Sequence, residues 1–467
     1  MTITTYPPAV LHESTLRVAM VFPPAATRSS KLAKRSSKLV PRKGSGAQEP
    51  EIPTTASFAS EAIDVVLFPE AYISACDRKR TKALKKLAAD LRAQLVVGAE
   101  EESGDFGGRV CQVLLQFDPD GSISRAYTKH STAEAVAFER PDWQPRSMLP
   151  TIELGGVTAG ATICHDHYLG LLPRFLAKRG ALVWINPSFD NVTEIKWSSV
   201  LRLRAVENRC FSLCTLHSRS NGRRTHPFAF SPDGAELCAR RAGVGAEKTQ
   251  PLSKCREGGN IYVVDLDLAA AGEPLDWSKL PPAKKPQRAR NGEPRRPVRV
   301  TLRGGQPTIV GCSSRNDLDS GFHGETAHGP VYVGVVPGER ILDASECFRV
   351  LDRAKRLNCS PIIWNHWDQL PTESGSLATL MMGRAIECCA PVVISDRVGI
   401  RELVELSNRN KIPTRRVIDS SGEAIVDLGY AWGLDNAFKM VANRLPAKMR
   451  KRMTRIALDH YRKLLVV

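Results

Sequence analysis

Residues 156–188, GVTAGATICHDHYLGLLPRFLAKRGALVWINPS, decide the fold class. A nearly continuous apolar run ends at Cys164, a polar cluster follows, and then come an amphipathic stretch and a second apolar run. Short apolar runs on either side of a segment with helical periodicity predict a strand, a turn, a helix and a second strand. Cys164 has two interpretations, either a nucleophile at the end of a strand or a buried thiol of the core.

Strand and helix signals alternate through the first 270 residues. Apolar strand patterns occur at 16–22, 63–68, 95–98, 110–117, 157–163, 181–185, 210–216 and 260–266. Helical patterns occur at 78–93, 168–179 and 194–208, and DPDG at 118–121 predicts an antiparallel hairpin. This alternation predicts an α/β fold in which helices cover a sheet.

The composition bounds the class of protein. A chain of 467 residues is too long for one typical domain, so we expect two or three. It has no apolar run long enough to span a bilayer and no secretory signal pattern, which predicts a cytoplasmic protein without a membrane partner. The twelve cysteines are then expected to be free thiols. The net charge of +17 favours an anionic partner or surface.

Two basic segments interrupt the pattern. Residues 27–60 repeat the unit RSSKL and predict a flexible insertion after the first strand. Residues 271–329 contain the run KKPQRARNGEPRRPVR and predict an interdomain linker. We therefore expect a first domain at 1–270 and a smaller α/β domain at 330–467 that ends in a basic helix. The basic segments fit either an arm for nucleic acid or an acidic partner, or solvated surface without a ligand.

Three polar groups each close an apolar run. Glu70 follows a strand in LFPEAYIS, Lys129 ends the strand after DPDG in SRAYTKHS, and Cys164 ends another in TICHDHY. If these strands lie in one sheet, their ends converge on a single pocket.

These stretches, in this order, resemble the nitrilase superfamily of carbon–nitrogen hydrolases. The resemblance spans about residues 15–268 and includes IDVVLFPE, AYTKH, TICHD and GALVWINPS, the helix-to-strand segment KWSSVLRLRAVENRCFSLC, and the closing strand IYVVDLDL. It implies a four-layer αββα sandwich of the nitrilase type for the first domain, which would be the catalytic one, beside a smaller C-terminal α/β region.

The resemblance also implies roles for five residues. Cys164 would attack a carbonyl or nitrile carbon, and Glu70 would take the thiol proton and later activate water. Lys129 and the backbone N–H of His165 would stabilise the oxyanion. Glu139 would hold Lys129, although Glu134 is a nearby competitor for that role. The resemblance implies no metal and no organic cofactor.

The Cys-His-Asp-His cluster at 164–167 leaves a metal site as an alternative, because Cys and His are good zinc ligands. Adjacent residues of a strand point to opposite faces, so only some of the four could converge on one ion. Asp166 fits a structural hydrogen bond at the strand-to-helix turn. Arg204 and Glu207 fit the anchoring of a helix.

The resemblance predicts a thiol-dependent hydrolase of a non-peptide C–N bond in a small amide, carbamoyl or nitrile substrate. Two departures leave the substrate open: His167 follows Asp166, and YLGLLP replaces a usual recognition segment. Acyl or ammonia transfer to a second substrate would use the same intermediate. The alternative from another class is a nitrilase-like scaffold that binds nucleic acid or a protein partner through its basic segments, with weak or no catalysis.

The C-terminal region resembles a degenerate, partial second copy at about 330–430. VYVGVVPGERIL parallels VTAGATICHDHYL, and SLATLMMGRAIECCAPVVIS parallels SSVLRLRAVENRCFSLCTLH. This alignment places Gly338 where the first copy has Cys164. Members of the family pair as dimers, so a homo-oligomer is one expectation, and a half-copy in the place of a partner subunit is another. An unrelated α/β domain is the alternative.

Overall fold

The structure is a computed structural model. It describes residues 15–24, 50–58, 61–103, 109–129, 131–132, 135–138, 151–168, 171–189, 194–218, 225–244, 248–272, 301–303, 308–309, 315–317, 321–326, 329–357, 359–370, 374–388, 390–396, 400–407, 412–418 and 423–425. Most of the basic insertion, the linker at 273–300 and the expected C-terminal helix lie outside these residues, as do Glu134 and Glu139.

The first sheet of the N-terminal unit has nine strands, in the order β15-β14-β16-β1-β2-β4-β5-β6, with β3 paired to β4. The strands are β1 (Thr15–Phe22), β2 (Val65–Leu67), β3 (Ile73–Ser74), β4 (Gln94–Ser103), β5 (Arg109–Phe117), β6 (Ile123–Thr128), β14 (Cys238–Arg241), β15 (Gln250–Pro251) and β16 (Asn260–Asp267). Helix α1 (Arg78–Leu91) covers one face, and Asp77 caps it by accepting a hydrogen bond from the Arg80 N–H. The hairpin predicted at DPDG is confirmed, because β5 and β6 pair antiparallel across it.

The second sheet has five strands in the order β13-β12-β11-β10-β9. The strands are β9 (Ile152–Leu154), β10 (Val157–Ala161), β11 (Val183–Ile185), β12 (Phe211–Cys214) and β13 (Phe228–Phe230). A 3-10 turn, η4 (Cys164–Tyr168), and helix α3 (Leu171–Ala177) connect β10 to β11, and α4 (Glu194–Asn208) connects β11 to β12. The strand, turn, helix and strand predicted for residues 156–188 are therefore confirmed.

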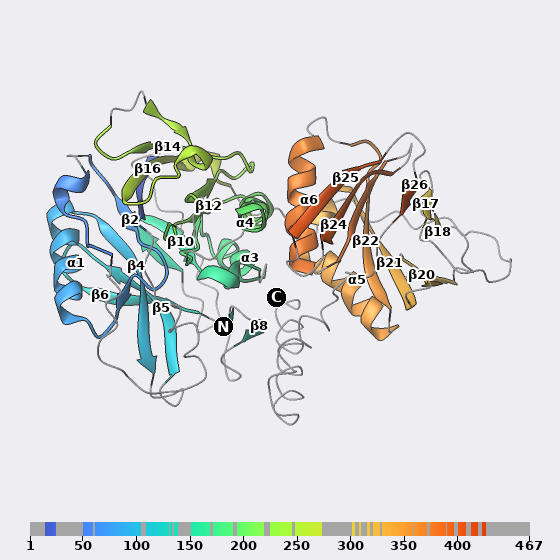
Figure 1. Cartoon of the computed structure of the whole chain (residues 1–467), viewed down its shortest axis with the longest axis horizontal. Helices are drawn as coiled ribbons and strands as arrows, with labels where there is room; N and C mark the ends of the chain where they lie inside the picture. Colours follow the sequence, from blue (N-terminus) through green and yellow to red (C-terminus); the bar gives the residue numbers. More distant parts are fainter. Residues whose placement is uncertain are drawn as a thin grey trace, which may run out of the picture.

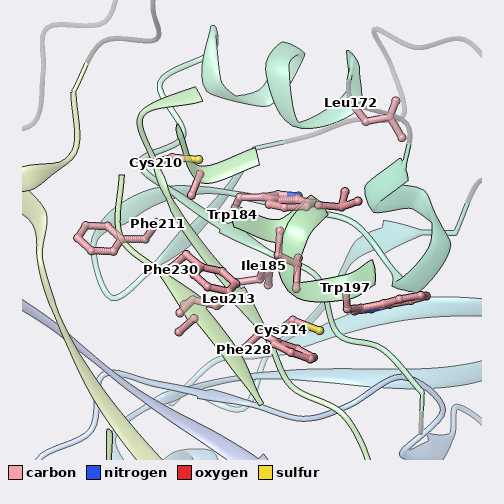
Figure 2. Packing of buried hydrophobic residues seen from close by; sticks show 14 of the residues in the cluster. Leu172, Trp184, Ile185, Trp197, Cys210, Phe211, Leu213, Cys214, Phe228 and Phe230 are labelled. Carbon is pink, nitrogen blue, oxygen red and sulfur yellow. The ribbon is translucent and has the colours of Figure 1, made fainter. Parts of the chain in front are cut away.

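The two sheets pack face to face. Val18 and Met20 of β1 belong to the same apolar cluster as residues of the second sheet, whereas Ala19 and Val21 of β1 pack with Leu84 of α1. Figure 1 shows α1 on the outer side of the first sheet and α3 and α4 on the outer side of the second. Leu172 of α3 and Trp197 of α4 join the cluster built on β11 and β12 (Figure 2). The four-layer αββα sandwich expected from the sequence is confirmed.

The C-terminal unit contains a seven-stranded sheet with the order β19-β20-β21-β22-β23-β24-β25 and a three-stranded sheet with the order β18-β17-β26. The elements are β17 (Thr301–Arg303), β18 (Thr308–Ile309), β19 (Arg315–Asp317), β20 (Gly321–Thr326), β21 (Gly329–Pro337), η9 (Gly338–Leu342), α5 (Ala344–Arg356), β22 (Ser360–His366), α6 (Ser374–Cys388), β23 (Val392–Ser395), β24 (Ile400–Ser407), β25 (Ile412–Val417) and β26 (Glu423–Ile425).

The boundary of this unit differs from the predicted one. The sequence predicts a linker over 271–329, yet β17 to β20 fall between Thr301 and Thr326. β20 pairs antiparallel with β21 along its whole length, so it is part of the C-terminal sheet. These strands are short and contain few apolar residues, which is why the sequence pattern does not separate them from a linker.

The remaining short elements are the strands β7 (Ser131–Thr132) and β8 (Ala135–Phe138), which pair with each other, and the 3-10 turns η2 (Thr55–Phe58), η6 (Leu252–Lys254) and η7 (Leu268–Ala270). The nine cysteines whose side chains are described are all free. In the described ranges, every helix is too short or too polar to cross a membrane.

Candidate active site

Glu70, Lys129 and Cys164 meet between the two sheets of the N-terminal unit. Glu70 lies just beyond β2, Lys129 directly follows β6, and Cys164 opens the turn η4 after β10. The Lys129 Nζ atom lies 2.6 Å from Glu70 Oε1 in a buried ion pair. The three residues are only 5, 7 and 7% exposed, respectively. The structure therefore brings together three residues that are far apart in the chain.

The Glu70 backbone is held by contacts from three other segments. Its N–H donates to the Ser188 carbonyl at 3.3 Å, and the His217 Nε2–H donates to the Glu70 carbonyl at 3.1 Å. Gly98 of β4 lies directly against this loop, since a Cβ atom there would be 2.2 Å from the Pro69 carbonyl oxygen and 2.5 Å from the Glu70 Cα. A side chain at position 98 would push Glu70 out of place.

Lys129 remains a cation in this buried setting. Its backbone N–H continues the ladder by donating to the Gln112 carbonyl of β5 at 2.9 Å. Burial lowers the pKa of the Lys129 ammonium, but the charge of the Cys164 sulfur when it is ionised and that of Glu70 outweigh this effect and raise the pKa above its ordinary value. Lys129 thus supplies a fixed positive charge beside the sulfur.

The Cys164 backbone adopts a left-handed conformation, with φ of +49°. Only glycine takes this conformation without steric cost, so the turn must be held by its surroundings. The Cys164 N–H donates to the Pro187 carbonyl at 3.0 Å, and the Cys164 carbonyl accepts from Asn186 Nδ2 at 3.2 Å and from His167 Nδ1 at 2.5 Å. These three bonds hold the backbone of the turn that carries the sulfur.

The charges around Cys164 determine how it could react. Burial, together with the negative charge of Glu70, raises the pKa of the Cys164 thiol to about 12, and the positive charge of Lys129 opposes the rise. The thiol is therefore protonated at neutral pH and needs a base to become a nucleophile. Glu70 Oε2 is buried and receives no N–H or O–H bond from the part of the chain that is described. The arrangement thus offers an acceptor for the thiol proton.

His165 and Asp166 lie on different sides of the turn. The His165 Nδ1 atom is 3.5 Å from Cys164 Sγ, and its ring meets the edge of Trp197 at 5.3 Å between centroids. Asp166 is fully buried and accepts a hydrogen bond from the Tyr127 hydroxyl at 2.7 Å. Asp166 therefore ties the turn to β6, in keeping with the structural role expected for it.

The structure gives no metal site at the Cys-His-Asp-His cluster. Burial lowers the pKa of His167 well below its ordinary value, and its Nδ1 is engaged by the Cys164 carbonyl. Within the described ranges, His, Cys, Asp and Glu side chains form no group of three that could hold a metal ion. Glu139, and Glu134 as its competitor, lie outside those ranges, so the role of Glu139 stays a prediction.

Several residues that support this site carry no role in the sequence analysis. They are Gly98, Tyr127, Asn186, Ser188 and His217. Asn186 also accepts a hydrogen bond from the Thr162 hydroxyl at 3.0 Å, which fixes its amide orientation. Asn186 and Ser188 lie in the segment INPS, which is part of a motif of the resemblance, so the sequence could have indicated that these two residues support the site. The others act through contacts between distant segments, which leave no local pattern.

Part of the chain is similar in sequence to known proteins. The family model for carbon–nitrogen hydrolase matches residues 19–243. An aliphatic nitrilase of Sinorhizobium fredii is 28% identical over 135 residues, which cover 28% of this chain and 41% of that protein. A nitrilase of Bradyrhizobium diazoefficiens is 25% identical over 201 residues, which cover 41% of this chain and 59% of that protein. The chain thus spans about half the length of these curated relatives.

The crystal structure of an amidase from Nesterenkonia sp. is 19% identical and has a TM-score of 0.38, with 54% of this chain and 90% of that chain covered. Residues 19–243, just under half of the chain, match the carbon–nitrogen hydrolase family, and this part of the chain is similar to known nitrilases.

Proposed function

We propose that the chain is a thiol-dependent hydrolase that cleaves a non-peptide C–N bond through a covalent acyl intermediate on Cys164. The observation that carries the proposal is the buried Glu70–Lys129 ion pair, 2.6 Å between Nζ and Oε1, beside a thiol whose backbone is held in an unfavourable conformation. A base, a cation and a sulfur in one buried site are the groups that acyl transfer requires.

The first half of the reaction forms a carbon–sulfur bond. Glu70 accepts the Cys164 proton as the sulfur attacks the carbonyl carbon of an amide or carbamoyl group. The Lys129 ammonium and the backbone N–H of His165 donate hydrogen bonds to the developing oxyanion. When the C–N bond breaks, the leaving nitrogen takes the proton from Glu70 and departs as ammonia or an amine, leaving an acyl thioester.

The second half of the reaction returns the free thiol. Glu70 removes a proton from a water molecule that attacks the acyl carbon, and the proton is passed to the leaving sulfur. The product is a carboxylic or carbamic acid. A nitrile substrate would enter the same sequence through a thioimidate, to which water must add before ammonia leaves.

The burial of the site favours small substrates. The three proposed catalytic residues are each less than a tenth exposed, which favours a small substrate over a folded polypeptide. The His165 ring, whose Nδ1 lies 3.5 Å from Cys164 Sγ, packs on the edge of Trp197. These contacts support a compact acyl or nitrile group as the part of the substrate that binds.

The test is ammonia release from a panel of small aliphatic amides, carbamoyl compounds and nitriles, combined with mass spectrometry of the intact protein. We expect turnover of at least one class and an acyl adduct on Cys164. Cys164→Ser and Glu70→Gln should each lower kcat by a factor of about 100 or more, the usual scale for loss of a general base.

Cys210→Ser is the matched control. Cys210 is also buried, and burial also raises its pKa to about 12, but it precedes β12, whereas Cys164 follows the parallel strand β10, so the two thiols lie at opposite edges of the second sheet. This variant should keep wild-type turnover. Adducts spread evenly over several cysteines, or turnover that survives Cys164→Ser, would overturn the proposal.

A further inference from the structure

The C-terminal sheet repeats the topology of the sheet that carries Cys164. In the order β13-β12-β11-β10-β9, the neighbours pair antiparallel, parallel, parallel and antiparallel. The order β24-β23-β22-β21-β20 has the same sequence of pairings. A helix follows the turn after β10 and another joins β11 to β12, as α5 and α6 do in the C-terminal unit.

The two units also agree at single residues. Gly160 of β10 lets Leu176 of α3 pack closely, since a Cβ atom there would lie 2.9 Å from the Leu176 side chain. Gly334 of β21 does the same for Val350 of α5, with 2.4 Å between the corresponding atoms. The spacing between glycine and partner is the same in both units, so the match extends from the strand to the helix.

The turn after the strand is also shared, but its chemistry is not. Gly338 opens η9 with φ of +41°, as Cys164 opens η4 with φ of +49°. The Gly338 carbonyl accepts a hydrogen bond from Asn365 Nδ2 at 2.8 Å, as the Cys164 carbonyl does from Asn186. The C-terminal unit thus keeps the turn and has no sulfur on it.

Helices α4 and α6 pack against each other at the boundary of the two units (Figure 1). Gly383 of α6 lies directly over α4, because a Cβ atom there would be 2.6 Å from the Ser199 carbonyl oxygen and 3.1 Å from the Leu203 Cβ. This close approach brings the matching segments RAVEN and RAIEC together.

The contact is built around four buried charges, which we call the Arg–Glu cluster: Arg204, Glu207, Arg384 and Glu387. Each arginine forms an ion pair with the glutamate of its own helix and another with the glutamate of the other helix. Within α4 the pair is Arg204–Glu207 at 2.6 Å, and within α6 it is Arg384–Glu387. Between the helices the pairs are Arg204–Glu387 at 2.8 Å and Arg384–Glu207 at 2.7 Å. All four side chains are at most 1% exposed. The cluster is therefore reciprocal, as at an interface between two copies of one structure.

The cluster also holds both turns. Arg204 Nε donates to the His167 carbonyl at 2.9 Å, within the turn that Cys164 opens. Arg384 Nε donates to the Ile341 carbonyl at 3.0 Å, within the turn that Gly338 opens. Because Arg204 also binds Glu387, the C-terminal unit is connected to the Cys164 turn through one side chain.

We propose that the C-terminal unit is a partial second copy of the Cys164 layer and acts as a built-in partner that positions the Cys164 turn through the Arg–Glu cluster. In this arrangement α6 covers the face of α4 that contains Ser199 and Leu203. Arg204 is a positioning residue, held in place by Glu387 and Glu207. The inference rests on the proposed function only in taking Cys164 as the reactive group.

The test is alkylation of the full-length chain by iodoacetamide, followed at Cys164 and at the exposed Cys238 by peptide mass spectrometry over a range of pH. The perturbing variants are Gly383→Ala, Arg384→Lys and the isosteric Glu387→Gln. We expect alkylation of Cys164 to slow at least fivefold at neutral pH and its pH profile to move to higher pH, while Cys238 reacts at the wild-type rate.

Arg401→Ala is the matched control, because it removes an arginine that pairs with Asp396 at 2.8 Å inside the C-terminal unit. It should leave Cys164 alkylation unchanged. Wild-type rates and pH profiles at Cys164 in folded Glu387→Gln and Arg384→Lys would overturn the inference. Since alkylation needs no substrate, a chain that hydrolyses nothing on the panel but shows this response would refute the proposed function alone.

Discussion

Lys129 Nζ lies 2.6 Å from Glu70 Oε1, and both side chains are almost completely buried. Two opposite charges in such a setting depend on each other, because either one alone would keep its cost of desolvation without a partner. The pair also faces the Cys164 thiol, whose pKa responds to both charges. Stability and reactivity are therefore coupled at this point in the molecule.

Removing one member of the pair should destabilise the fold more than removing both. Lys129→Met leaves the Glu70 carboxylate buried without its cation, and we expect the free energy of unfolding to fall by about 3–5 kcal/mol. The double variant Lys129→Met with Glu70→Gln should lose less than the sum of the single losses. Urea denaturation of the wild type, the two single variants and the double variant completes a double-mutant cycle. Additive losses of the free energy of unfolding would show that the two side chains do not interact.

The bond between Tyr127 and Asp166 should be important for the stability of the turn. The Tyr127 hydroxyl donates to Asp166 Oδ2 at 2.7 Å, and Tyr127→Phe removes this donor from a buried carboxylate. The free energy of unfolding should fall by about 1–3 kcal/mol. Tyr262→Phe is the control, since the Tyr262 hydroxyl donates to the Glu257 carbonyl at 3.2 Å. Equal losses in the two variants, measured by thermal unfolding, would contradict this prediction.

Gly98 should be needed to place Glu70. Gly98→Ala puts a Cβ atom 2.2 Å from the Pro69 carbonyl oxygen, so the loop that carries Glu70 must move. A shift of about 1 Å in a catalytic group can lower kcat by a factor of about 100. Steady-state kinetics on the best substrate of the panel give this value. Gly272→Ala is the control, because this glycine has more open surroundings, and it should keep wild-type kinetics. Wild-type activity of Gly98→Ala would show that Gly98 is not needed to place Glu70.

Acid should destabilise the folded chain through His167. Burial lowers the pKa of His167 well below its ordinary value of 6.5, so the folded chain holds this side chain neutral. The unfolded chain binds a proton below pH 6.5, and the stability that is present above this pH is lost as the pH falls. The slope from one such group approaches 1.4 kcal/mol per pH unit, on the order of one proton.

The comparison of wild type with His167→Gln isolates this contribution. The variant keeps a donor for the Cys164 carbonyl but no longer titrates, so its free energy of unfolding should depend less on pH between 6.5 and about 4.5. Urea denaturation at a series of pH values gives both curves. Parallel curves would show that His167 is protonated as readily in the folded chain as in the unfolded one.

Much of the fold could be predicted because the local pattern and the tertiary structure agree. The helix predicted over 194–208 is α4 with the same bounds, and the strand predicted over 16–22 is β1 with one further residue. Three-residue strands such as β9 and β13 were not predicted, because so short a run carries no period. The prediction of a linker over 271–329 was wrong where β17 to β20 lie, because these strands contain few apolar residues.

The site was predicted in part. Glu70, Lys129 and Cys164 each close an apolar run, so their place at strand ends could be read from the sequence. Tyr127 of β6 and Asp166 of the turn η4 form a buried bond between distant segments, and nothing near either residue in the sequence indicates the other. The catalytic roles of these residues, including the His165 N–H and Glu139, stay predictions until the variants are measured.

The backbone torsions of Cys164 and Gly338 have a consequence for how such a turn changes over evolution. A left-handed residue with a Cβ atom costs about 1–2 kcal/mol relative to a relaxed one, and glycine avoids this cost. In the turn η4 the strained residue is Cys164, which carries the sulfur. In the turn η9 the residue at the same place is Gly338, which has no side chain. Cys164 keeps the cost of a Cβ atom in a left-handed conformation, whereas Gly338, at the start of the corresponding turn, avoids it.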